Sequence, residues 1–336
     1  MLVAPDIDQS AIIACLRSEY GVDAETVAFL AVGADADTAA YRVVAQNGDR
    51  FFLKLRSGDF LDASVSVPHY LASHGAGWVI GPIPTRSGVL SADVTVFTAV
   101  LYPFHDGTSG WNRRLSREQW IKLGAGVRTL HDAEIPIDLL RAVPRESFRS
   151  PWRRDLPRRL EQLREDSAGD PVIRELSELL ERHRSTVEHL LYRAEVLAGR
   201  LTHRPAHTTA CHGDLHAGNI LIDSLDHLFV VDWDTIVVAL RERDLMFIGG
   251  GVGGTWNKQH ECEWFFDGYG SVEIDPYALL YYRCERIVED ICVVCSELLE
   301  SNAAEPDRAE MVRQIADQFG AGNVVEIALR TDETVR

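Results

Sequence analysis

The chain has 336 residues, enough for two domains or for one unit with two lobes, each with its own hydrophobic core. Apolar residues make up 46% of the sequence and charged residues 25%, as in soluble globular proteins. The 34 basic residues face 51 acidic ones, and a net charge of −17 disfavours nucleic acid and anionic membranes as partners and favours small cationic ligands.

The N-terminus has none of the features of a secretory signal, because Asp6 and Asp8 interrupt it and no basic segment precedes a long apolar run. No stretch approaches the roughly eighteen uncharged apolar residues of a membrane span. The six cysteines are spaced irregularly, unlike a disulfide framework, and Cys292 and Cys295 lie in an apolar helical pattern that predicts buried thiols. We expect a cytoplasmic protein without a membrane or nucleic-acid partner, and we expect a monomer.

The chain up to residue 104 predicts a small antiparallel sheet. An amphipathic helix is expected over 6–20, ending near Gly21, and a second helix over 62–73. The sequence Asn47-Gly48-Asp49 is typical of a tight hairpin turn between two of the expected strands. Runs rich in apolar and β-branched residues predict strands over 26–32, 40–45, 50–56, 78–83 and 93–101.

Beyond residue 104 the pattern changes from strands to helices, so we place a hinge within 101–110. This divides the chain into an N-terminal lobe over 1–104 and a C-terminal lobe over 105–336. Ser116 and Gln119 form a capping box ahead of apolar residues at helical spacing, which predicts a helix ending near His131. Further helices are expected over 153–166, 171–198, 258–269, 275–300 and 306–319.

Residues 211–234 read CHGDLHAGNILIDSLDHLFVVDWD and carry three side chains suited to phosphoryl transfer. Asp214, Asn219 and Asp232 are separated by five and thirteen residues, with an apolar, strand-like run between the last two. In kinase-type sites one carboxylate orients the attacking hydroxyl, while an amide and a second carboxylate hold the magnesium ions that neutralise charge on the transferring phosphate. The segment therefore predicts phosphoryl transfer.

A phosphoryl-transfer site also needs a cation for the nucleotide phosphates, and Lys54 is one of only three lysines. It lies in the apolar run Phe52-Leu53-Lys54-Leu55, where it either has an anionic partner or is an exposed lysine of an edge strand. Upstream, the turn from Gly33 to Thr38 joins two expected strands and is suited to cover phosphates with backbone N–H groups, although most hairpin turns have a similar composition. The order of turn, lysine strand and Asp214 segment matches kinase architecture.

The motifs HGDLHAGN and VVDWD resemble those of the aminoglycoside phosphotransferase and choline kinase family, relatives of protein kinases that phosphorylate hydroxyl groups of small molecules. The resemblance implies an α+β, two-lobed protein-kinase-like fold, with a small antiparallel-sheet N-terminal lobe and a larger, mainly helical C-terminal lobe. It implies that Asp214 orients the acceptor hydroxyl and accepts its proton. Asn219 and Asp232 would bind Mg²⁺, and Lys54 would contact the α- and β-phosphates of ATP.

The remaining nucleotide contacts implied by the resemblance lie around the lysine strand, at Gly33, Asp37, Thr38 and Asp62. Two features depart from the family pattern. The family usually has a glutamate on the helix after the lysine strand, where this chain offers the shorter Asp62, and Pro68 follows in the same expected helix. Trp233 follows the metal aspartate, so no mobile activation segment of the protein-kinase type is inferred.

A narrower resemblance, to the spectinomycin phosphotransferases of that family, rests on residues 241–253, 256–258, 266–270 and 282–291. It implies ATP-dependent phosphorylation of spectinomycin at the C9 hydroxyl, which inactivates the antibiotic. Spectinomycin carries two methylamino groups that are cationic at neutral pH, which suits the acidic balance of the chain. We expect substrate contacts from Asp234, Tyr282, Glu285 and Glu289.

Alternatives stay open at this point. The helix over 277–300 also fits a salt-bridged face made of Arg283, Arg286 and Glu289. The same chemistry on another aminoglycoside, a choline-like alcohol or a sugar is a second possibility, and a nucleotide-binding regulator that has lost catalysis is a third. The glycine run over 249–254 lacks the strand-turn-helix context of a dinucleotide site, and we interpret it as a turn.

Overall fold

The computed structural model describes residues 4–32, 37–203, 207–300 and 305–335. Contacts group the chain into two compact units. The N-terminal unit consists of Met1–Arg113, Glu134–Val143 and Gly218–Ile236. The helical unit consists of Arg114–Ala133, Pro144–Ala217 and Val237–Arg336. The expected lobe boundary within 101–110 stays a prediction.

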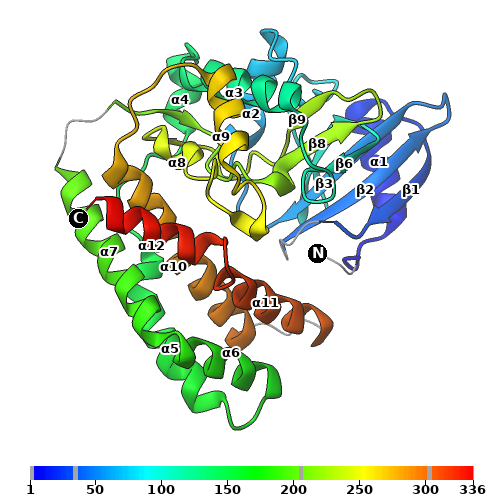
Figure 1. Ribbon diagram of the computed structural model, residues 1–336. Coiled ribbons are helices and arrows are strands. Elements are labelled where there is room, and N and C mark those ends of the chain that lie inside the picture. The colour runs from blue at the N-terminus through cyan, green and yellow to red at the C-terminus, as the bar shows by residue number, and fades with distance from the viewer. Residues whose placement is uncertain (1–3, 33–36, 204–206, 301–304, 336) are drawn as a thin grey trace. The chain divides into compact units, whose positions relative to one another are not determined.

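A five-stranded antiparallel sheet with the strand order β1-β2-β3-β5-β4 forms the base of the N-terminal unit (Figure 1). The predicted hairpin turn between β2 and β3 is confirmed, and Gly48 takes the positive φ of +88° that such turns require. The strands are β1 (Ala24–Leu30), β2 (Thr38–Ala45), β3 (Arg50–Ser57), β4 (Ala92–Val94) and β5 (Phe97–Pro103).

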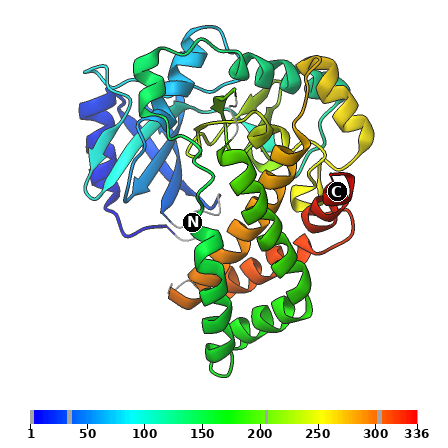
Figure 2. The same ribbon diagram turned by 90° about the vertical axis from the view of Figure 1, so that its left-hand side faces the viewer.

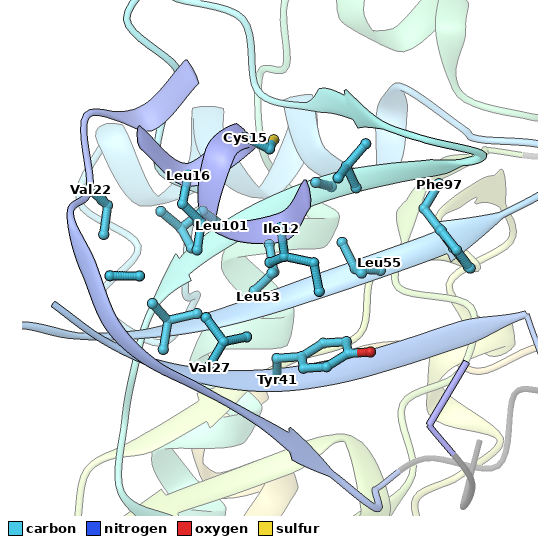
Figure 3. Packing of buried hydrophobic residues seen from close by; sticks show 14 of the residues in the cluster. Ile12, Cys15, Leu16, Val22, Val27, Tyr41, Leu53, Leu55, Phe97 and Leu101 are labelled. Atoms are coloured by element: carbon cyan, nitrogen blue, oxygen red, sulfur yellow. The ribbon is translucent and has the colours of Figure 1, made fainter. Parts of the chain in front are cut away.

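One face of this sheet is covered by α1 (Gln9–Cys15) and the π-helical turn Leu16–Tyr20 that continues it (Figure 3), which lie within the helix predicted over 6–20. Ile12 packs there against Leu53 and Leu55, which are almost completely buried. Because side chains alternate across a strand, burial of Leu53 and Leu55 on this face turns the residues between and after them to the opposite face. The apolar core therefore decides which face of β3 carries its cations.

The rest of the N-terminal unit contains a three-stranded sheet in the order β6-β8-β9 and two helices. The predicted strand over 78–83 is wrong: only Val79 makes a bridge, to Val230, because Gly77 and the Gly81-Pro82 step interrupt the run. The predicted strand over 93–101 is two strands, β4 and β5. The remaining elements are α2 (Ala63–Ser73), β6 (Gly107–Ser109), α4 (Ile137–Ala142), β8 (Ile220–Asp223) and β9 (Leu228–Val230).

The helical unit is built on α10, which packs along α5 and α7 (Figure 2). The predicted helix over 171–198 is two helices, because the chain leaves helical geometry at His183. Within the described parts of the chain, no helix is long and apolar enough to cross a membrane. The elements of this unit are α3 (Arg117–His131), α5 (Pro151–Asp166), α6 (Pro171–Arg182), α7 (Arg184–Thr202), β7 (Thr209–Cys211), β10 (Val237–Ala239), α8 (Glu242–Leu245), α9 (Gln259–Tyr269), α10 (Pro276–Glu300), α11 (Glu305–Gln318) and α12 (Val324–Thr334).

Helices α3 and α9 approach each other closely through two glycines. A Cβ at Gly124 would lie 2.0 Å from the Phe265 carbonyl oxygen, and a Cβ at Gly268 would lie 1.9 Å from the Ile121 carbonyl oxygen. Any side chain at either position would push the helices apart. The capping box that begins α3 at Ser116 is confirmed. These contacts fix the end of α3, which carries His131.

Candidate active site

Lys54 lies on the face of β3 opposite the apolar core and is held by two carboxylates of the N-terminal unit. Its Nζ lies 2.8 Å from Asp232 Oδ1 and 2.7 Å from Asp234 Oδ2, and 15% of its side chain is exposed. Burial would lower the pKa of Lys54, but the two carboxylates outweigh it and raise this pKa above its usual range. Because β3 pairs with both β2 and β5, the alternative of an exposed edge-strand lysine is wrong.

The carboxylates come from the segment after β9. Asp232 has a φ of +66°, which non-glycine residues rarely adopt and which is common at functional sites. Trp233 anchors the segment: its indole N–H donates to the Val230 carbonyl at 3.3 Å, and its ring packs on Trp78. Asp234 also accepts a hydrogen bond from Arg56, two residues after Lys54 on the same face of β3.

Asn219 is tied to the same segment, because its carbonyl accepts a hydrogen bond from the Val231 N–H at 2.9 Å. The structure therefore brings the two predicted metal ligands, Asn219 and Asp232, onto neighbouring stretches of chain beside Lys54. An amide oxygen and a carboxylate are hard ligands of the kind Mg²⁺ prefers, and 51% of the Asp232 side chain is exposed. These residues fit a magnesium ion, and their metal-binding role stays a prediction.

The other predicted nucleotide contacts lie elsewhere in the N-terminal unit. Gly33 lies outside the described residues. Asp37 is tied to the end of β3, because its carbonyl accepts from the Ser57 N–H at 2.9 Å, and Thr38 begins β2. Asp62 is exposed at the start of α2, and the described ion pairs of Lys54 are those with Asp232 and Asp234.

Asp214 lies in the helical unit, on the loop after β7. Its carboxylate hydrogen bonds to Arg286 of α10, and its Oδ2 lies 3.4 Å from His216 Nε2. Burial would raise the pKa of Asp214, but Arg286 and His216 outweigh it and hold this pKa far below its usual range. The predicted catalytic carboxylate is therefore ionised at neutral pH and fixed from both sides.

A second buried carboxylate, Asp244 of α8, holds the backbone of this loop. The N–H groups of His212 and Gly213 donate to it at 2.9 and 2.8 Å, and His131 Nε2 lies 3.1 Å from it. Tyr269 lies 2.7 Å from the other ring nitrogen of His131, so the network assigns the proton to Nε2. Sequence reasoning missed Asp244, although an acid opening the apolar run Leu-Met-Phe-Ile was a signal that it is paired when buried.

The four expected substrate contacts occupy different environments. Asp234 pairs with Lys54, as described above. Tyr282 is fully buried, and Glu285 is buried in an ion pair with Arg153 of α5. Glu289 is partly exposed on α10, one turn beyond Arg286. Of the alternative salt-bridged face made of Arg283, Arg286 and Glu289, the structure shows Arg286 in an ion pair with Asp290 of the same helix. Their roles toward a substrate stay predictions.

A sheet lysine held by two acids, and a loop that fixes an ionised aspartate, are typical of a phosphotransferase of the protein-kinase-like type. Residues 28–278 match the model of the phosphotransferase enzyme family, APH. The chain belongs to this family, and the resemblance inferred from the sequence is confirmed.

Solved structures extend the likeness to the whole chain. The crystal structure of spectinomycin phosphotransferase APH(9)-Ia in complex with ADP and spectinomycin is 33% identical, with a TM-score of 0.90 over 98% of this chain and 100% of that chain. The AMP-bound complex of the same enzyme is 32% identical, with a TM-score of 0.86 over 97% and 99%. The predicted fold class is confirmed.

Two further proteins are less similar to this chain. Amicoumacin kinase hAmiN is 16% identical with a TM-score of 0.62 over 95% of this chain and 94% of that chain, and it shares the fold alone. Protein StrN of Streptomyces griseus is 29% identical over 181 residues, which are 52% of this chain and 55% of StrN. The match thus spans about half the length of this curated relative.

Proposed function

We propose that the protein is an ATP-dependent O-phosphotransferase that phosphorylates spectinomycin, at the C9 hydroxyl that the family resemblance implies. One observation carries the choice of substrate: the likeness to the spectinomycin phosphotransferase covers 98% of this chain and 100% of that one. Amicoumacin kinase, which shares the fold, is half as identical and has a TM-score of only 0.62.

In this proposal the N-terminal unit binds the nucleotide. Lys54, kept charged by Asp232 and Asp234, contacts the α- and β-phosphates once ATP competes for its ammonium group. Asn219 and Asp232 hold Mg²⁺, which when bound neutralises charge on the transferring phosphate. Arg56 stays with Asp234, so that this acid keeps a counter-charge when Lys54 turns to the phosphates.

Asp214 acts on the acceptor. Its carboxylate orients the substrate hydroxyl and takes its proton as the oxygen bonds to the γ-phosphorus and the bond from that phosphorus to ADP breaks. Only five residues separate Asp214 from Asn219, so the backbone keeps the two within about 18 Å of each other. Because no covalent intermediate on the protein is needed, positioning and electrostatics supply the rate enhancement.

The charge of the protein supports a cationic substrate. The net charge of −17 attracts a dication, and Glu289 offers a partly exposed carboxylate close to Arg286 and hence to Asp214. Burial raises the pKa of Glu289, against the opposing effect of Arg243 and Arg286. Burying the charged Glu289 carboxylate without a partner costs free energy, and an ion pair with a methylammonium group of the substrate would offset this cost.

A panel of acceptors tests the proposal. The purified protein is incubated with ATP and Mg²⁺ and with spectinomycin, other aminocyclitols, aminoglycosides, choline and simple sugars, and ADP release is measured for each. We expect spectinomycin to give the highest kcat/KM. A higher value for any other acceptor would reassign the substrate within the family, and no acceptor-dependent ADP release would favour a regulator without catalysis.

A further inference from the structure

We propose that Arg286 is a positioning residue for the reaction: it holds the Asp214 carboxylate in one orientation, as the first link of a relay that runs through Asp290 to Gln318. This inference rests on the proposed function, because it assigns Asp214 the role of orienting the acceptor. Arg286 lies 72 residues from Asp214 in sequence, and neither the family motif nor the resemblance gives it a role.

The contacts form a continuous chain of hydrogen-bonded polar groups within the helical unit. Arg286 donates through one terminal nitrogen to Asp214 Oδ1 and through Nε to Asp290 Oδ1 at 2.7 Å. The other oxygen of Asp290 accepts from Gln318 Nε2 of α11 at 2.8 Å. The guanidinium also lies 5.9 Å from the centre of the Phe247 ring.

This arrangement differs from an ordinary surface ion pair. The side chains of Arg286, Asp214 and Asp290 are only 21%, 20% and 25% exposed, so water screens their interaction little. A planar guanidinium bonded through two of its nitrogens has little freedom to turn. The orientation that α10 and α11 impose on Arg286 is therefore passed to Asp214.

The consequence for the reaction concerns geometry more than basicity. In a loose transition state the hydroxyl proton moves late, so a carboxylate contributes chiefly by aligning the oxygen with the γ-phosphorus. Arg286 holds Oδ1, while His216 lies 3.4 Å from Oδ2. Without Arg286, the Asp214 carboxylate stays ionised but loses the hydrogen bond that holds its Oδ1. The hydroxyl that this carboxylate orients is then no longer aligned with the γ-phosphorus.

Two substitutions test the inference. Arg286→Met removes the charge and the hydrogen bonds while keeping much of the side-chain volume. Arg286→Lys keeps the charge but lacks the planar guanidinium that donates to Asp214 and Asp290 at the same time. We expect kcat to fall about 100-fold for Arg286→Met and by a smaller factor for Arg286→Lys, with KM for ATP within about twofold of wild type. Arg283→Met is the matched control, since Arg283 is another partly buried arginine of α10, bonded to Thr331. The Arg283→Met substitution is expected to lower thermal stability and to leave the pH profile of kcat unchanged.

The titration of Asp214 gives a readout that does not depend on turnover. In protein labelled with ¹³C at aspartate carboxyl groups, Asp214 is assigned by its loss in Asp214→Asn. We expect no protonation of Asp214 within the ordinary aspartate range in wild type, and protonation inside that range in Arg286→Met. The acidic limb of the kcat profile moves to higher pH by the same amount.

The outcomes separate this inference from the proposed function. Wild-type protein that transfers no phosphoryl group to spectinomycin defeats the proposed function, and the carboxyl titration still decides whether Arg286 holds Asp214. A folded Arg286→Met variant with wild-type kcat and an unmoved titration overturns the inference. If that variant does not fold, Asp290→Asn takes its place, because it weakens the anchor of Arg286: a lower kcat at unchanged KM for ATP supports the relay, and unchanged kcat overturns it.

Discussion

Replacing Asp244 by asparagine is predicted to destabilise the helical unit by loosening the loop that carries Asp214. Asp244 is completely buried and its carboxylate receives the N–H groups of His212 and Gly213 and the Nε2–H of His131. Asparagine keeps one acceptor oxygen and turns an N–H₂ donor toward at least one of these donors.

The magnitude follows from the bonds that are lost. A hydrogen bond to a charged group contributes about 1.5–3 kcal/mol, so losing one and burying an unsatisfied donor costs about 3 kcal/mol. In a unit of roughly 200 residues each kcal/mol lowers the melting temperature by about 2–4 °C, which gives a fall of about 6–12 °C. Because Asp214 follows the two held N–H groups directly, we also expect kcat to fall at least tenfold.

Differential scanning calorimetry measures the stability change, with Asp267→Asn as the matched control. Asp267 forms a pair with Arg117 at 2.8 Å in which both side chains are at least half exposed, so its loss shifts the melting temperature by at most about 2 °C. An Asp244→Asn protein that melts within 2 °C of wild type would refute the reasoning.

The dependence on pH has a defined sign. Burial would raise the pKa of Asp244, but hydrogen bonds from His131 and the loop backbone outweigh it and lower this pKa from its ordinary 3.8. The stabilising contribution of Asp244 is therefore complete above about pH 4 and is lost as the pH falls through the folded-state pKa. The gap between wild type and Asp244→Asn stays constant from pH 8 to pH 5 and narrows below pH 4.

Three further substitutions separate the parts of the site. Lys54→Met is expected to weaken ATP binding at least tenfold in isothermal titration calorimetry, because the phosphates lose their cation; unchanged affinity would remove Lys54 from the nucleotide site. Glu285→Gln removes the buried charge that pairs with Arg153, which keeps its second partner Glu195, and is expected to cost about 2–3 kcal/mol of unfolding free energy with KM for spectinomycin unchanged; a raised KM in folded protein would make Glu285 a substrate contact. Glu289→Gln is expected to raise KM for spectinomycin about tenfold and to leave KM for ATP as it is, whereas equal shifts in both would argue against a counter-charge.

Local signals predicted most of the fold. Gly21, Gly48 and the Ser116 capping box mark real boundaries, because a turn or a cap needs particular residues at the point where it occurs. The wrong predictions arose where residues that break a strand outweighed a strand-like composition. The run over 78–83 has strand composition, but Gly81 and Pro82 leave it with a single bridge.

In the candidate site, too, residues close in sequence could be predicted and contacts between distant residues could not. The spacing within residues 211–234 predicts a site at Asp214, Asn219 and Asp232, because these side chains lie close in sequence. Contacts that cross the chain carry no local signal: Arg286 reaches Asp214 from 72 residues away, and Asp244 reaches the loop backbone from 31 and 32 residues away. The Lys54 contact with Asp234 spans 180 residues and has no local signal either.

Phosphoryl transfer to spectinomycin tests the central claim most directly. The wild-type protein and Asp214→Asn are incubated with ATP, Mg²⁺ and spectinomycin, and the products are measured by mass spectrometry and by NMR of the modified hydroxyl. The proposal predicts spectinomycin carrying one added phosphoryl group, at C9, with wild type, and no product with Asp214→Asn, which still binds ATP. Unmodified spectinomycin with wild type, or equal product with both proteins, would contradict it.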